Sequence, residues 1–215
     1  MSRVLRTPDS AFENIPDYPF EPHYIKVTDK ALGDLRLHYV DHGPRDGRVV
    51  IMMHGEPSWS FLYRHMISTV ADAGYRVIAP DLIGFGKSDK LAETSDYSYA
   101  SHVDWMSQWF EALDVSSAAL FCQDWGGLIG LRLVAAYPGR FAGVMAANTF
   151  LPTGAGKPSP AFEQWKTFSQ TVPVFPVGGV IRGATVTDIG EEVEAAYDAP
   201  YPDERYKAGA RIFPA

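Results

Sequence analysis

The chain has 215 residues, of which 46% are hydrophobic and 21% are charged, and its formal net charge is −7. This composition excludes a disordered chain, and acidity without a lysine or arginine cluster argues against nucleic acid or an anionic membrane as a partner. The single cysteine, Cys122, excludes an intrachain disulfide, and no apolar run reaches the length of a signal peptide or membrane span. We therefore expect a globular cytoplasmic protein.

Taken in order, the chain begins with proline- and aromatic-rich residues and two short β-like runs, residues 24–28 and 35–40, which predict an antiparallel pair at a sheet edge. It then alternates between apolar strands and amphipathic helices. The predicted strands are residues 49–53, 76–79, 118–122 and 142–148, and the predicted helices are residues 60–73, 97–113 and 128–137. Repeated strand-helix-strand units indicate a parallel sheet with right-handed crossovers. Trp105 and Trp109 are interpreted as core residues.

The character of the chain changes after Phe150. Residues 152–160 are interpreted as a linker, residues 161–170 and 188–197 as helices, residues 171–183 as a loop, and the remainder as proline-rich chain. We expect residues 1–151 to form the core. Residues 152–215 should form a helical lid over the carboxyl edge of the sheet, where open α/β sheets bind ligands.

The sequence around Asp124 predicts a strand, an abrupt turn and a helix, the arrangement of a nucleophile elbow. Cys122 and Gly126 are small because this turn brings backbones close together. Aspartate is anionic at neutral pH, is favoured at a helix start, and can attack carbon to form a covalent ester. The alternative is that Asp124 only caps a helix, but the upstream loop favours the nucleophile.

That upstream loop, residues 54–59 (HGEPSW), follows a buried strand and should face the elbow. In this architecture the expected oxyanion donors are the backbone N–H groups of Glu56 and Trp125. A Glu56 carboxylate near Asp124 should raise one of their two pKa values, whereas the alternative is a surface glutamate on a turn. His54 is interpreted as a structural imidazole rather than a base.

Two tryptophans are candidates for holding an anion. The indole of Trp125 is a donor without acceptor capacity, so it can hold a leaving anion without transferring a proton. Trp165, on a predicted lid helix, is a second candidate, and packing within the lid is its alternative role. No metal-ligand cluster or dinucleotide fingerprint is present, so we expect neither a metal nor an organic cofactor.

Residues 54–59, 80–89 (PDLIGFGKSD) and 123–127 (QDWGG) resemble those of α/β-hydrolases and, among them, haloalkane dehalogenases. The resemblance runs along essentially the whole chain. It implies an α/β-hydrolase fold: a mostly parallel sheet with helices on both faces, plus a helical lid. The chain has Glu56 in the loop of residues 54–59 and no Asp or Glu between residues 141 and 162. In both respects it resembles the branch of the family whose second halide donor is a lid tryptophan.

The resemblance also implies the roles of the site residues. Asp124 would displace halide from a small apolar halogenated substrate, forming an alkyl ester. Glu56 and Trp125 would supply the oxyanion N–H groups, and the indoles of Trp125 and Trp165 would bind the halide. Water, activated by a histidine paired with an acid, would then hydrolyse the ester.

The chain departs from this family in one respect. All six histidines precede Asp124, whereas the fold orders nucleophile, acid and histidine along the chain. The general base and acid, and the C-terminal strands that carry them, are therefore expected to be absent from what resembles a truncated dehalogenase. Such a chain could form the ester without hydrolysing it. The alternatives are an epoxide hydrolase, which would use lid tyrosines such as Tyr197, Tyr201 and Tyr206, and a non-catalytic hydrolase-fold fragment.

Overall fold

The computed structural model describes residues 3–152, 154 and 156–215, so residues 153 and 155 of the predicted linker lie outside the described residues. The main sheet has six strands in the order β2-β3-β5-β4-β7-β8. Their bounds are β2 (Pro22–Asp29), β3 (Gly33–His42), β4 (Val49–Met53), β5 (Arg76–Pro80), β7 (Ala118–Gln123) and β8 (Phe141–Ala147). Strands β5, β4, β7 and β8 run parallel, while β2 and β3 form the predicted antiparallel edge.

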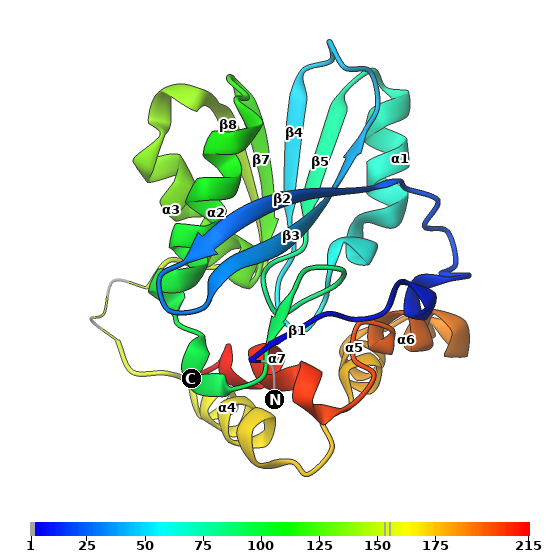
Figure 1. The fold of residues 1–215 in the computed structure, drawn as a ribbon, viewed down its shortest axis with the longest axis vertical. Coiled ribbons are helices and arrows are strands. Elements are labelled where there is room, and N and C mark those ends of the chain that lie inside the picture. The colour runs from blue at the N-terminus through cyan, green and yellow to red at the C-terminus, as the bar shows by residue number, and fades with distance from the viewer. Residues whose placement is uncertain (1–2, 153, 155) are drawn as a thin grey trace.

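Helices cover the sheet and one end of the molecule. Their bounds are α1 (Arg64–Asp72), α2 (Tyr99–Leu113), α3 (Trp125–Ala136), α4 (Pro160–Thr171), α5 (Val177–Ala184), α6 (Gly190–Asp198) and α7 (Ala208–Ile212). Figure 1 shows α1 flanking the sheet opposite α2 and α3, with α4 to α7 gathered below the sheet. Short 3₁₀ helices span Asp9–Phe12, Ser60–Tyr63, Thr94–Asp96, Pro138–Arg140 and Glu204–Lys207, and β1 (Val4–Leu5) pairs with β6 (Lys90–Leu91). The predicted α/β class, with a mostly parallel sheet, is confirmed.

The register of the parallel strands positions the elbow. Met53, the last residue of β4, lies opposite Cys122 of β7, and Gln123 lies opposite Ala147 of β8. Because parallel strands end at the same edge, the loop after β4 and the turn after β7 emerge side by side. The sheet thus brings residues 54–59 next to Asp124.

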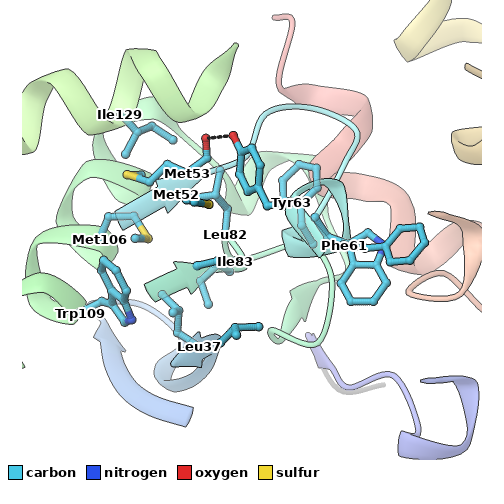
Figure 2. Packing of buried hydrophobic residues seen from close by; sticks show 14 of the residues in the cluster. Leu37, Met52, Met53, Phe61, Tyr63, Leu82, Ile83, Met106, Trp109 and Ile129 are labelled. Atoms are coloured by element: carbon cyan, nitrogen blue, oxygen red, sulfur yellow. Dashed lines mark hydrogen bonds between the residues drawn. The ribbon is translucent and has the colours of Figure 1, made fainter. Parts of the chain in front are cut away.

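The core fills both sides of the central strands. Figure 2 shows Met52 and Met53 of β4 among buried side chains from several elements, with the Tyr63 hydroxyl donating to the Met53 carbonyl at 2.8 Å. Trp105 and Trp109 are buried, which confirms their interpretation as core residues. All five residues of β4 are apolar, as expected for a strand that is covered on both faces of the sheet.

Two helical segments were missed by the sequence prediction. Residues 171–183 were expected to form a loop, but α5 begins at Val177. A Cβ on Gly178 would lie 2.4 Å from the Glu194 carbonyl, so a glycine lets α5 pack closely on α6, and its N–H donates to Asp198 Oδ1 at 2.9 Å. The last part of the chain was expected to be proline-rich, but its residues Ala208–Ile212 form α7. Tertiary packing outweighs weak helix propensity at both places.

The far edge of the sheet is β8. Its side chains are mostly exposed, including Met145 at 65%. Within the described residues, no helix combines the length and hydropathy needed to cross a membrane.

Candidate active site

Asp124 occupies a sharp turn between β7 and α3. Its backbone angles are φ 52° and ψ −128°, a positive φ that non-glycine residues rarely adopt. The turn is fixed by hydrogen bonds from Asp124 N to the Asn148 carbonyl at 3.1 Å and from Gly127 N to the Asp124 carbonyl at 2.9 Å. The Thr149 hydroxyl also donates to that carbonyl, at 2.7 Å. A strained residue held this firmly between strand and helix has the geometry of a nucleophile elbow.

Glycines allow the two loops to meet. A Cβ on Gly126 would lie 2.1 Å from the Met53 carbonyl oxygen, and a Cβ on Gly55 would lie 2.3 Å from the Cβ of Asp124. Both contacts are shorter than any real side chain permits. The close approach expected from the small residue at position 126 is therefore present, and Gly55 has the same role in the facing loop.

Backbone donors surround the Asp124 carboxylate. The N–H of Glu56 donates to Asp124 Oδ1 at 2.8 Å, and the N–H of Trp125 is a second donor. Burial raises the pKa of Asp124 above its ordinary value, and these two hydrogen bonds act in the opposite direction. The structure thus brings together three of the predicted site residues, Asp124, Glu56 and Trp125.

The Glu56 carboxyl group is buried beside this nucleophile. Among the described residues, its Oε1 atom has no hydrogen-bond partner. Burial raises the pKa of Glu56 well above its usual range, and the negative charge of Asp124 raises it further. Of the two carboxyl groups, Glu56 is therefore the one that keeps its proton.

The two candidate halide-binding tryptophans lie on different elements. The ring of Trp125 packs edge-on against Phe213, with centroids 4.8 Å apart, whereas Trp165 on α4 stacks on Phe168 and contacts Phe175. No contact between the two indole rings and no hydrogen bond from either indole N–H is present in the described part of the chain. Both donors are thus available, and each is held by its own aromatic neighbours.

The side chains of His38, His54 and Asp81 form buried hydrogen bonds that connect the loops next to the site. His54 is buried, with Nε2 accepting the Leu82 N–H at 3.0 Å and Nδ1 bonded to the Gly55 carbonyl at 2.9 Å. Asp81 accepts from His38 Nδ1 and Ser60 N, both at 2.7 Å. Although burial opposes it, contact with His38 holds the pKa of Asp81 below its usual range.

This network has two consequences for the sequence predictions. Both ring nitrogens of His54 are engaged, which agrees with a structural imidazole. His38 of β3 is one half of a buried pair with Asp81. Neither this pairing nor the Thr149 contact could be found from sequence, because the partners lie 43 and 25 residues apart.

The geometry and the sequence comparisons define the same class of protein. A family model described as the alpha/beta hydrolase fold matches residues 48–176. The sheet, the elbow and the facing loop are those of an α/β-hydrolase.

Similarity to known proteins narrows this class. A haloalkane dehalogenase from Psychrobacter cryohalolentis is 57% identical over 212 residues, which cover 99% of this chain and 70% of that protein. Another from Mycolicibacterium paratuberculosis is 54% identical, covering 98% of this chain and 70% of that protein. The solved structure of the tetrameric haloalkane dehalogenase DpaA from Paraglaciecola agarilytica NO2 superposes with a TM-score of 0.92 at 39% identity, covering 98% of this chain and 70% of that one.

The chain belongs to the haloalkane dehalogenase family, as its motifs indicated, and it spans about 70% of the length of these relatives. Members of this family are hydrolases that act on carbon–halide bonds. This membership favours dehalogenation over epoxide hydrolysis.

Proposed function

We propose that the Asp124 carboxylate displaces halide from a saturated carbon of a haloalkane. A carbon–oxygen bond forms as the carbon–halide bond breaks, and the halide leaves with the bonding electron pair. The observation that carries this proposal is the elbow itself: a strained, half-buried aspartate whose Oδ1 is fixed by the Glu56 N–H at 2.8 Å. The carboxylate oxygen that does not accept from Glu56 is left to attack.

The departing halide is held by the indole N–H groups of Trp125 and Trp165. Support comes from their unused donors and from their placement, one beside the nucleophile and one on α4. An indole donor stabilises an anion without giving up its proton. Both tryptophans are half-buried against aromatic rings, and hydrogen bonds are stronger where the surroundings are less polar than water.

Ester hydrolysis would use the backbone N–H groups of Glu56 and Trp125 as the oxyanion hole. These donors already face the Asp124 carboxylate in the free protein. Neither of the buried histidines His54 and His102 is placed as the base: His54, which follows β4, has both ring nitrogens bonded to backbone groups, and His102 lines a cavity that Asp124 does not line. We therefore propose that this chain stops at the alkyl ester.

Residues 152–215 act as the lid in this proposal, and residues 1–151 as the core. Several contacts join the two parts. Trp59 Nε1 donates to the Ala196 carbonyl at 3.1 Å, and the Thr7 hydroxyl donates to the Pro200 carbonyl at 2.6 Å. Phe213 packs against both Phe85 and Trp125, so the lid reaches the elbow directly.

The test is incubation of the chain with a primary bromoalkane, followed by intact-mass measurement over time, with Asp124→Asn as the matched control. We expect an alkyl adduct that persists in the wild type and is absent from the control. Steady multiple turnover would contradict the arrest at the ester. Diol formation from an epoxide, without bromide release from the bromoalkane, would contradict the reaction class.

A further inference from the structure

A cavity of about 90 Å³ lies on the Trp125 side of the elbow. Its wall comes from the start of α2 with the two residues before it, from the start of α3, and from the end of α7 with residues that follow it. The described wall is largely aromatic, with Tyr97, Tyr99, Trp125 and Phe213 as its large members, and it includes His102. Of the predicted site residues, Trp125 lines this cavity, whereas Asp124, Glu56 and Trp165 do not.

His102 is an unusual member of this wall. It is only 3% exposed, and neither Nδ1 nor Nε2 has a hydrogen-bond partner within the described residues. Its ring stacks on Tyr97, with centroids 5.8 Å apart, and meets Phe213 edge-on at 4.5 Å. Buried polar groups are normally hydrogen-bonded, so two orphaned nitrogens beside a cavity indicate a ligand.

The imidazole of His102 offers two kinds of hydrogen bond. Burial, with the nearby His54, lowers the pKa of His102 to about 3, so the ring is neutral. A neutral imidazole carries one N–H donor and one acceptor nitrogen. The other polar side chains of the wall, apart from the Trp125 indole, are already engaged: Tyr97 with Leu91, Tyr99 with Leu128, and Ser98 with Ser101.

We propose that this cavity binds a short primary alcohol of about two or three carbons, with its hydroxyl on His102 and its hydrocarbon against the aromatic wall. Scaling from the roughly 150 Å³ cavity that accepts benzene, this volume holds about four non-hydrogen atoms. A hydroxyl can donate to one imidazole nitrogen or accept from the other. A halide would need several donors, and a lone water would lack its usual two to four polar partners.

Such an alcohol belongs to the chemical class released by haloalkane hydrolysis. Its interpretation as a product, bound beside Trp125, rests on the proposed function. The binding does not, because it follows from the cavity and His102 alone. It is therefore measured without any haloalkane, and a chain that fails to alkylate Asp124 can still bind the alcohol.

The experiment is a titration of the histidine-¹⁵N-labelled chain with 1-propanol, followed by long-range ¹H–¹⁵N spectra of the imidazole nitrogens. Ethyl methyl ether, of equal size but unable to donate, is the matched probe. We expect a saturable shift of one His102 nitrogen with 1-propanol and a weaker response to the ether. A non-saturating shift, or a nitrogen signal that 1-propanol leaves unchanged because only water occupies the site, would overturn the proposal.

Two variants locate the binding. His102→Phe keeps an aromatic ring but removes both nitrogens, and Ile212→Phe reduces the cavity at its half-buried wall while leaving His102 in place. We expect each to weaken the alcohol's binding by about tenfold or more. If His102→Phe does not fold, Ile212→Phe and the wild-type nitrogen shift decide the matter. Unchanged affinity in a folded variant of either kind would overturn the assignment.

Discussion

The backbone N–H of Glu56 lies within 2.8 Å of Asp124 Oδ1, while the side chain of Glu56 brings a second carboxyl group to the same site. The backbone and the side chain of Glu56 therefore have opposite effects on the negative charge of Asp124. The N–H stabilises negative charge on Asp124. The carboxyl group avoids repelling that charge only by keeping its proton, which its raised pKa allows.

If Glu56 is neutral and acts through its backbone, Glu56→Gln should preserve ester formation. The amide has nearly the shape of the protonated acid and leaves the N–H in place. We expect the rate of adduct formation from a bromoalkane, measured by intact mass, to stay within about threefold of wild type. A loss of about tenfold or more would show that the ionised carboxylate is needed.

Gly126→Ala should disrupt the elbow, because its new Cβ would meet the Met53 carbonyl oxygen at 2.1 Å. We expect destabilisation of about 3 kcal/mol or failure to fold, measured by urea unfolding. Gly139→Ala is the matched control, since a Cβ there meets nothing within 4 Å. It should change stability by less than about 1 kcal/mol. Similar effects at both positions would contradict the steric account.

Removing either indole N–H should slow the displacement step. Trp125→Phe and Trp165→Phe each retain an aromatic ring but lose the donor, and we expect about 100-fold slower adduct formation in each. Trp109→Phe, in the buried core, is the control and should leave the rate unchanged in folded protein. A wild-type rate for Trp165→Phe would assign that residue to packing on Phe168 and Phe175 alone.

Lys90 should make stability depend on pH. Its ammonium group is fully buried and donates to the carbonyls of Gly86 and Ser88, at 2.5 and 2.8 Å. Burial lowers its pKa to about 7, so between about pH 7 and 10 the unfolded chain holds a proton that the folded chain has lost. The free energy of unfolding should therefore rise with pH in this window, by up to about 1.4 kcal/mol per unit.

Lys90→Met should remove this rise, whereas Lys30→Met, at an exposed position, should retain it. Urea unfolding at about pH 7.5 and 9 measures both slopes. An equal slope in wild type and Lys90→Met would assign the pH dependence to other groups.

The exposed edge at β8 should promote self-association, because unpaired strand edges with apolar side chains recruit other chains. Met145→Lys places a charge on that edge and should lower the associated fraction in sedimentation velocity, with stability changed by about 0.5 kcal/mol or less. Val186→Lys is the control: it also replaces an exposed apolar residue, but away from the sheet. Equal reduction by both variants would point to general solubility rather than to the edge.

Much of the fold was predictable because it depends on local patterns. The apolar run of β4 was placed at its observed bounds, and β5 and α2 were found to within two residues. Runs of this kind specify burial on both faces or on one helix face without reference to the rest of the chain. The elbow was recognisable for the same reason, since its small residues, Cys122 and Gly126, each lie two positions from Asp124.

Other features depend on residues distant in sequence, and only the tertiary structure decides them. Helix α5 forms because Gly178 can lie against Glu194 of α6. The hydrogen bond to Asp124 joins residues 68 positions apart, and the raised pKa values of Asp124 and Glu56 follow from how deeply the fold buries them. The sequence determines which chemical groups this protein carries and the local turns that hold them. Their burial, pairing and charge are set by packing, because desolvation and contact distance exist only once distant segments meet.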